Sequence, residues 1–178
     1  ISTGGIFFDL PGIGGRSHEN YVSEAQNFYK SHSSDDSVIP AILPHGSYTV
    51  SPQNLSEAKS IADEHGMLFC THAAETQAEQ NDIKTRYNNS VIRHLDKYKL
   101  LGETSVLAHC VHLDKTEISL LAQSKTNVVL NPMSNLKLGS GIAPVKEMYR
   151  AGINLTLGTD GAISGNDLDM WLAMRLTC

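Results

Sequence analysis

One segment of this chain, Met67-Leu68-Phe69-Cys70-Thr71-His72-Ala73-Ala74-Glu75-Thr76, predicts both a fold class and a place for chemistry. An apolar run of strand-like length follows Gly66 and ends at His72, and a carboxylate, Glu75, follows three residues later. A buried strand therefore opens into a loop that carries polar groups. This is where α/β barrels keep their catalytic residues.

The same pattern recurs twice further along the chain. Residues 104–109 form an apolar run that ends at His109, and residues 154–160 form another that ends at Asp160. The carboxyl ends of parallel strands meet at one edge of a sheet or barrel. We therefore expect His72, His109 and Asp160 to face a common mouth.

Strand-like and helix-like segments alternate along the whole chain. Strands are expected at 6–10, 38–43, 67–72, 104–109, 127–130 and 153–158. Helices are expected at about 17–30, 51–65, 78–99, from 114, 143–151 and from about 167, with a loop at 133–141. Near-continuous apolar strands joined by helices predict a parallel sheet covered by helices.

Two architectures contain such a sheet, an open doubly wound fold and a (β/α)8 barrel. The loop Gly12–Gly15 matches the dinucleotide-binding glycine pattern only partly, because the third glycine is lacking. Polar residues at the ends of several different strands favour the barrel. The predicted fold class is thus an α/β (β/α)8 TIM barrel, of which six strands are present.

Composition excludes several classes of protein. The 178 residues carry a net charge of -5 with no run of Lys or Arg, so we expect no nucleic-acid or membrane-surface partner. No stretch approaches the roughly 20 apolar residues of a bilayer span, so a soluble, cytoplasmic protein is expected. Three cysteines are too few for a disulfide framework, and we expect Cys70 and Cys110 to be buried, reduced thiols rather than zinc ligands.

The strand-end residues have the chemistry of a metal-dependent hydrolase. Catalytic zinc takes nitrogen and oxygen ligands, and His72 and Asp160 each end a strand and precede small residues that leave room for a ligand. Glu75 is close enough to deliver a proton, although a carboxylate here also suits a helix N-terminus. His109 and Asp160 are candidates to orient and deprotonate water, and His45 also ends a strand. For each histidine, a structural role in the core is the alternative.

Five motifs resemble those of the metal-dependent amidohydrolase superfamily. They are His72-Ala73-Ala74-Glu75-Thr76, His109-Cys110-Val111-His112-Leu113, residues 131–138 with 141–145, Gly158-Thr159-Asp160-Gly161-Ala162, and Ser164 with residues 166–170. Within the superfamily they are most similar to 5'-methylthioadenosine/S-adenosylhomocysteine deaminases and their chlorohydrolase-like relatives. The resemblance extends over nearly the whole chain.

The resemblance implies a role for each matching residue. His72 corresponds to a fifth-strand metal ligand, Asp160 to an eighth-strand ligand that is also the general base, and Glu75 to the acid that protonates the purine ring and binds the substrate. His109 corresponds to a histidine beside the metal and its water, and His45 to one that contacts the substrate. The implied cofactor is one divalent metal, Zn²⁺ or alternatively Fe²⁺. The implied partner is a small purine nucleoside, and a homo-oligomer is compatible with the family.

One departure from the family pattern changes the expectation for activity. The family also binds its metal through a His-x-His pair on the first strand, and this sequence contains no such pair. We therefore expect residues 1–178 to form a single partial barrel domain, roughly strands 3 to 8, without the first strands and the β-sandwich subdomain. As a fragment it should be weakly active or inactive.

Two further functions stay open at this point. The same site could serve guanine deamination or chlorotriazine-type hydrolysis, which a substrate panel would separate from adenosine deamination. The chain could also be a catalytically silent fragment with a half-built metal site. Metal analysis distinguishes that last possibility.

Overall fold

A computed structural model describes residues 2–9 and 17–177 of the chain. The loop Gly12–Gly15 and the last residue, Cys178, lie outside the described residues. Within the described part, no helix is both long enough and apolar enough to cross a bilayer.

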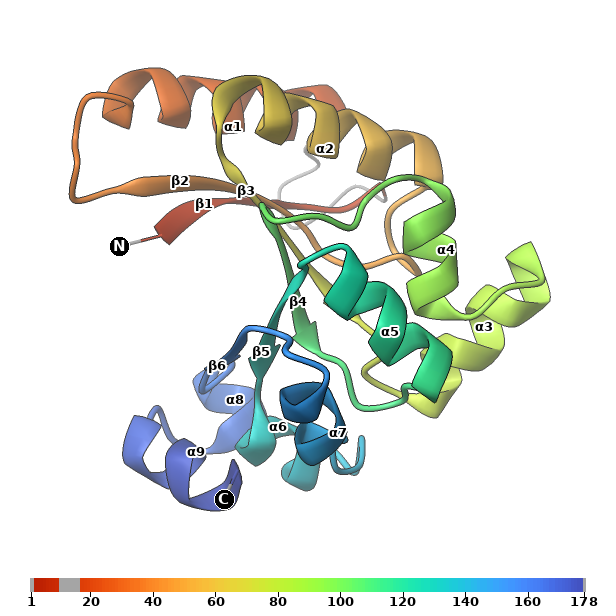
Figure 1. Cartoon of the computed structure of the whole chain (residues 1–178). Coiled ribbons are helices and arrows are strands. Elements are labelled where there is room, and N and C mark those ends of the chain that lie inside the picture. The colour runs from red at the N-terminus through yellow and green to blue at the C-terminus, as the bar shows by residue number, and fades with distance from the viewer. Residues whose placement is uncertain (1, 10–16, 178) are drawn as a thin grey trace.

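The core of the fold is a six-stranded parallel sheet (Figure 1). Its strands are β1 (Ser2–Phe7), β2 (Ile39–Pro44), β3 (Leu68–Ala73), β4 (Ser105–His109), β5 (Asn127–Leu130) and β6 (Leu155–Leu157). Each strand pairs only with its neighbours in sequence, so the order β1 to β6 never reverses. A doubly wound sheet reverses its strand order at a switch point, and a barrel does not. The prediction of six parallel strands in a partial (β/α)8 barrel is therefore confirmed.

Helices follow the strands and cover the outer side of the sheet as it curves (Figure 1). They are α1 (His18–His32), α2 (Pro52–His65), α3 (Gln77–Tyr87), α4 (Val91–Lys97), α5 (Lys115–Gln123), α6 (Pro132–Lys137), α7 (Val145–Arg150), α8 (Ala162–Gly165) and α9 (Met170–Thr177). Their ends follow from capping chemistry. The Ser51 hydroxyl accepts from the Asn54 N–H at the start of α2, and Gly66 ends that helix in a left-handed conformation (φ 65°).

The single helix predicted over residues 78–99 is wrong, because two helices occupy this region. Asn88 adopts a left-handed conformation (φ 52°) and ends α3, and Ser90 precedes α4. The Gln80 side chain then accepts a hydrogen bond from the Val91 N–H at 3.1 Å, which joins the two helices across the break. Asparagine tolerates the left-handed region, so it ends a helix much as glycine does.

The loop predicted over residues 133–141 is also wrong in its first half. Pro132 stands at the first position of α6, where its missing N–H costs nothing. The final helix begins at Met170 rather than near residue 167, because the extra turn α8 comes first. These short helices lie directly after β5 and β6, so they bear on the geometry of the strand ends.

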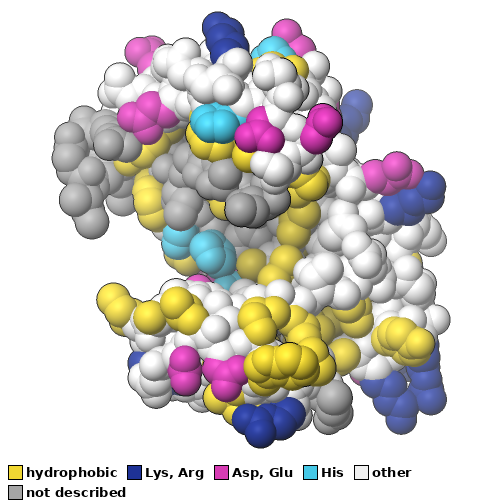
Figure 2. Space-filling model, turned by 90° about the vertical axis from the view of Figure 1, so that its left-hand side faces the viewer, with side chains coloured by type: hydrophobic (Ala, Val, Ile, Leu, Met, Phe, Trp, Pro, Cys, Tyr) yellow, Lys and Arg dark blue, Asp and Glu magenta, His cyan; other side chains and the backbone are white. Residues whose placement is uncertain are grey.

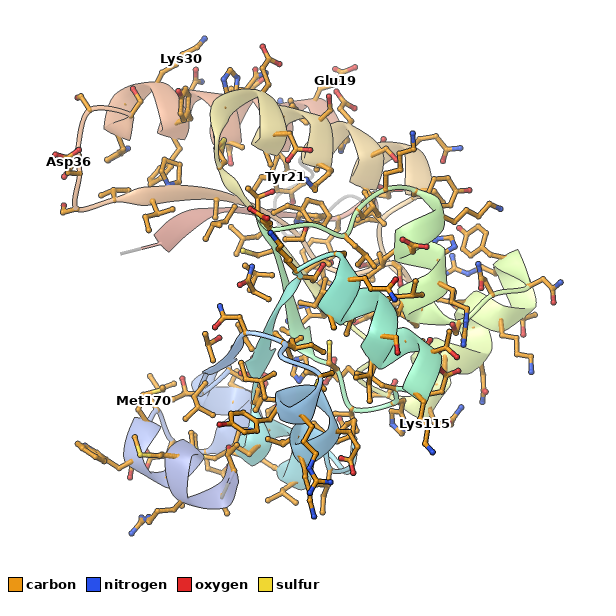
Figure 3. All side chains as sticks on the ribbon, viewed as in Figure 1. Glu19, Tyr21, Lys30, Asp36, Lys115 and Met170 are labelled. Carbon is orange, nitrogen blue, oxygen red and sulfur yellow. The ribbon has the colours of Figure 1, made fainter. Side chains whose placement is uncertain are left out.

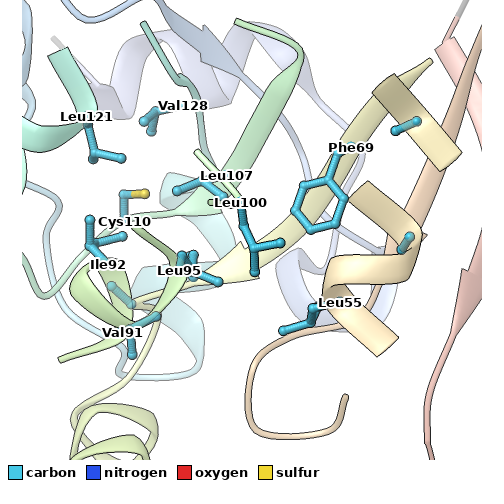
Figure 4. Packing of buried hydrophobic residues seen from close by; sticks show 14 of the residues in the cluster. Leu55, Phe69, Val91, Ile92, Leu95, Leu100, Leu107, Cys110, Leu121 and Val128 are labelled. Carbon is cyan, nitrogen blue, oxygen red and sulfur yellow. The ribbon is translucent and has the colours of Figure 1, made fainter. Parts of the chain in front are cut away.

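The hydrophobic core lies between the helices and the outer face of the sheet. Leu55, Phe69, Leu95, Leu107 and Leu121 are fully buried there (Figure 4). Along β3, side chains alternate between buried positions facing the helices and half-buried positions on the opposite face. This alternation is why His72 is free to face the concave side.

The first helix shows how the outer layer is oriented. Tyr21 is buried and points from α1 toward the strands, whereas Glu19 and Lys30 are exposed and point away (Figure 3). Helix α1 therefore covers the sheet with one apolar stripe, as expected for an outer helix of a barrel.

Candidate active site

Three of the predicted histidines form a row across the ends of neighbouring strands. The ring centroids of His45 and His72 lie 4.8 Å apart, and those of His72 and His109 lie 5.3 Å apart. Figure 2 shows histidine side chains on the wall of a hollow in this face of the molecule. The residues come from the ends of β2, β3 and β4, so the sheet topology places their backbones at one edge of the sheet.

Hydrogen bonds determine which nitrogen of His72 carries its proton. Nδ1 lies 2.6 Å from the His45 carbonyl oxygen, which can only accept, so Nδ1 is the donor. In a neutral imidazole this leaves Nε2 with a free lone pair. A histidine that donates through Nδ1 to a carbonyl is oriented in the way that metal-binding histidines commonly are.

His109 has the same arrangement with a different partner. Its Nδ1 lies 2.8 Å from Oδ1 of Asn135, a buried residue of α6. The amide oxygen accepts this bond, so the Nε2 of a neutral His109 is also unprotonated. That Nε2 lies 3.8 Å from Oε2 of Glu75.

The backbone turns His109 toward the site. His109 is paired in register with Ala73, and strict alternation would place both on the face opposite His72. Instead His109 (φ 76°) and Cys110 (φ 48°) both adopt left-handed conformations, and the ring of His109 lies beside that of His72. The strained turn at the end of β4 therefore re-aims the side chain.

Left-handed conformations occur after three of the strands that carry the predicted site. Besides His109 and Cys110, Ala74 follows β3 with φ 51° and Asp160 follows β6 with φ 58°. Such conformations are uncommon for residues other than glycine and cost roughly 1–3 kcal/mol each. They gather at functional sites, so they independently support this edge of the sheet as the site.

Asp160 lies within electrostatic range of both His72 and His109. Partial burial works to raise the pKa of Asp160, but Ser134, the Gly161 N–H and these two histidines outweigh it, so the pKa is lowered. Oδ1 accepts from the Gly161 N–H at 2.7 Å. Asp160 is thus an ionised carboxylate whose pKa is lowered in part by these two histidines.

Burial favours the neutral forms of His45 and His109. Burial, with a smaller effect from His72, lowers the pKa of His45 to about 4. Burial also lowers the pKa of His109, despite the opposing effects of Glu75 and Asn135. Neutral imidazoles offer lone pairs, which ligands to a cation require.

The nitrogen and oxygen atoms of these side chains are of the types that bind a divalent metal. The described residues alone do not provide enough of them for a complete metal site. His72 offers a free Nε2, and Asp160 offers a carboxylate whose pKa responds to that histidine. Among residues 2–9 and 17–177, no three His, Cys, Asp or Glu side chains are grouped closely enough to hold an ion. The nitrogen and oxygen donors suit zinc or iron.

Three further residues that the sequence singled out lie outside this row. His112 donates through Nε2 to the Ser140 carbonyl at 2.8 Å, and Cys110 is fully buried. Cys70 is half-buried and lines a cavity of about 180 Å³ with His45 and His72, and burial raises the pKa of its thiol to about 11. Neither thiol forms a zinc cluster within the described part of the chain.

Two residues that contact the predicted site were missed by the sequence reasoning. Asn135 accepts a hydrogen bond from the His109 ring, and Glu79 accepts one from the backbone N–H of Glu75. Asn135 lies inside a motif that was recognised without a role for it. Thr76 and Glu79 are spaced as in a capping box, a pattern that could have drawn attention to Glu79.

Comparison with known proteins gives a family and several relatives. Residues 4–178 match the Amidohydrolase family. The chain is 39% identical over 170 residues to the 5-methylthioadenosine/S-adenosylhomocysteine deaminase of Aquifex aeolicus (strain VF5), covering 96% of this chain and 39% of that protein. It is 40% identical over 153 residues to the 5'-deoxyadenosine deaminase of Methanopyrus kandleri, covering 85% of this chain and 36% of that protein.

A solved structure shares the same fold. The adenosine deaminase from Xanthomonas campestris with bound zinc superposes with a TM-score of 0.94 at 34% identity, over 97% of this chain and 39% of that chain. The chain therefore spans about 39% of the length of this structure and of the Aquifex aeolicus relative.

Proposed function

The chain belongs to the amidohydrolase family, and on that premise we propose that its strand-end site serves the hydrolytic deamination of an adenine-type nucleoside. Methylthioadenosine, S-adenosylhomocysteine and adenosine are the proposed substrates, because relatives at 39% and 40% identity are named for deaminating nucleosides of this kind. The observation that supports the proposal is that His109 lies beside both His72 and Glu75 at one edge of the sheet, with Asp160 in electrostatic range of the two histidines.

We assign the metal to His72 and Asp160. Zinc is the preferred ion, because imidazole and carboxylate donors suit it and a zinc-bound adenosine deaminase shares the fold, with Fe²⁺ as the alternative. When bound, such a cation lowers the pKa of water toward ~7 and so supplies a nucleophile at neutral pH. The Nδ1–H of His72, donated to the His45 carbonyl, keeps the Nε2 lone pair available.

The side chains of this chain divide the proton transfers between them. Asp160 takes a proton from the attacking water as its oxygen adds to the ring carbon that bears the amino group. Glu75 donates a proton to the adjacent ring nitrogen, and Asp160 passes the proton taken from water to the amino group, which leaves as ammonia. The remaining hydroxyl proton returns to Glu75 as the ring carbonyl forms. Neutral His109 accepts a hydrogen bond from the water through Nε2, because its Nδ1–H is held by Asn135. His45 contacts the substrate beside them.

The test compares metal binding and deamination in matched variants. His72→Ala and Asp160→Ala are expected to lose zinc, measured by metal analysis and calorimetric titration. Glu75→Gln should keep zinc but lose about 10²-fold or more in deamination of the three nucleosides, followed by ultraviolet absorbance. Glu64→Gln, an exposed carboxylate on α2, is the control and should match the wild type.

Two results would overturn the proposal. The first is a zinc-loaded full-length protein that leaves all three adenine nucleosides unchanged, whether or not it acts on guanine or a chlorotriazine. The second is deamination that persists at the wild-type rate in Glu75→Gln. Either result would remove the acid role from Glu75 or the adenine ring from the substrate.

A second candidate is a catalytically incomplete site, favoured by the lack of a third close ligand among the described residues. On that reading the chain binds zinc weakly and turns over none of the nucleosides. Stoichiometric zinc in the purified chain would contradict it.

A further inference from the structure

A second carboxylate, that of Glu79, contacts the backbone of Glu75 and has no role in the proposed chemistry. Glu79, in the first turn of α3, is 5% exposed. Its Oε2 accepts a hydrogen bond from the Glu75 backbone N–H at 2.8 Å, and its Oε1 accepts one from the Ser47 hydroxyl at 3.4 Å. Glu79 thus joins the loop after β2 to the loop after β3.

Helix capping alone does not account for this contact. Thr76 caps α3, and its hydroxyl accepts from the Glu79 N–H at 3.1 Å. In an ordinary capping box the glutamate would reach back to the N–H of the capping residue itself. Here the carboxylate reaches one residue further and binds the N–H of Glu75.

Burial of the Glu79 carboxylate is unfavourable for the stability of the fold. Burial, and to a smaller extent the charge of Glu75, raises the pKa of Glu79 to about 7. Glu75 and Glu79 also line one cavity of about 320 Å³ with Tyr48. Two acidic groups so close together are costly where a neutral cap would serve, and such pairs are typical of functional sites.

The backbone around Glu75 is held from both sides. Ala74 is in a left-handed conformation, and its carbonyl accepts from the N–H groups of Val111 and His112, each at 2.9 Å. Those bonds anchor the turn to the loop after β4, which also carries His109. Glu79 anchors the same turn to α3. Together they leave the Glu75 backbone little freedom.

We propose that Glu79 is a positioning residue, whose carboxylate fixes the Glu75 backbone so that the Glu75 side chain is directed toward His109 and the reacting ring. The effect on chemistry rests on the proposed role of Glu75 as the acid. The anchoring itself does not depend on any activity.

The experiment measures anchoring and catalysis separately in the same variants. Glu79→Ala removes both acceptor oxygens, so hydrogen exchange of the Glu75 amide should be about tenfold faster by NMR. Its kcat should fall by about 10²-fold with KM nearly unchanged, because a small misplacement of the acid slows the chemical step. Glu79→Gln keeps one acceptor oxygen for the Glu75 N–H and should restore both quantities to near wild type.

Two further variants make the comparison sharp. Asp96→Ala removes an exposed carboxylate on the neighbouring helix α4 and should change neither quantity. If Glu79→Ala does not fold, Glu79→Asp takes its place, since it keeps the charge but withdraws the carboxylate by one methylene. It should also speed the exchange of the Glu75 amide and lower kcat.

Each outcome decides the proposal. Unchanged exchange of the Glu75 amide in Glu79→Ala, or in Glu79→Asp where it replaces Glu79→Ala, overturns the anchoring. Faster exchange with an unchanged kcat overturns the role in catalysis. A wild-type protein without deaminase activity is a failure of the proposed function instead, and the exchange rates then still decide whether Glu79 anchors Glu75.

Discussion

The hydrogen bond between Asn135 and His109 permits a quantitative test that needs neither metal nor substrate. Asn135→Leu keeps a similar branched shape but removes the amide oxygen that accepts from His109 Nδ1. Both side chains are buried, at 3% and 1% exposure, so water cannot replace the lost acceptor. A buried donor without a partner costs about 1–3 kcal/mol.

This cost should appear directly in the free energy of unfolding. For a chain of this size, a loss of about 1–3 kcal/mol corresponds to a fall in Tm of roughly 2–12 °C. Urea denaturation measures the free energy, and Asn154→Leu is the matched control. Asn154 is exposed, although its side chain also forms a hydrogen bond, to Asn127 at 2.7 Å. The control should stay within about 0.5 kcal/mol of wild type.

The imidazole of His109 provides a second readout. In the metal-free wild type, nitrogen NMR shifts should report a proton on Nδ1, because that nitrogen donates to Asn135. In Asn135→Leu the proton should move in part to Nε2, where Glu75 is an acceptor 3.8 Å away. A variant with wild-type stability and an unchanged tautomer would refute the reasoning.

Three other changes test the core, its buried histidine and its buried thiol. Leu95→Ala should lower the free energy of unfolding by about 2–5 kcal/mol, because Leu95 is fully buried, whereas Leu168→Ala at a 59% exposed position should change it by less than about 0.5 kcal/mol. Burial holds the pKa of His94 below 6.5, so the unfolded chain protonates first and stability should fall as the pH drops below 6.5 toward the folded pKa. His94→Phe should flatten that part of a urea-denaturation pH series, and an unchanged slope would count against the assignment. Burial also raises the pKa of the Cys110 thiol, so iodoacetamide at about pH 8 should label Cys110 only after unfolding, as read by peptide mass spectrometry.

The features that sequence could predict depend on local patterns. The apolar run before His72 identifies a buried strand, and Ser51 with Pro52 identifies the start of α2, because each depends on neighbours in the chain. Asp114 and Glu117 form the capping box that their spacing predicts. Six strands in sequence order then follow, since alternation of strand and helix limits the topologies that are available.

The features that sequence missed depend on contacts across the fold or on single backbone angles. Asn88 breaks a helical pattern that looks continuous, because one left-handed residue is enough to redirect the chain. The alternation of side chains along β4 would place the His109 ring on the face of the sheet opposite His72. The left-handed turn at residues 109 and 110 places the ring beside His72 instead. The partner of His109 lies 26 residues away, on a helix where a loop was expected.

The left-handed residues at the strand ends also set a limit on protein engineering. Glycine at position 74 or 110 would relieve a strained angle that costs roughly 1–3 kcal/mol, which suggests a route to higher thermal stability. Yet Ala74 and Cys110 fix the backbone next to Glu75 and His109, and glycine would let the backbone at both sites move. A protein stabilised in this way would have a less rigid candidate active site. Substitutions that raise thermal stability are therefore better placed in the outer helices.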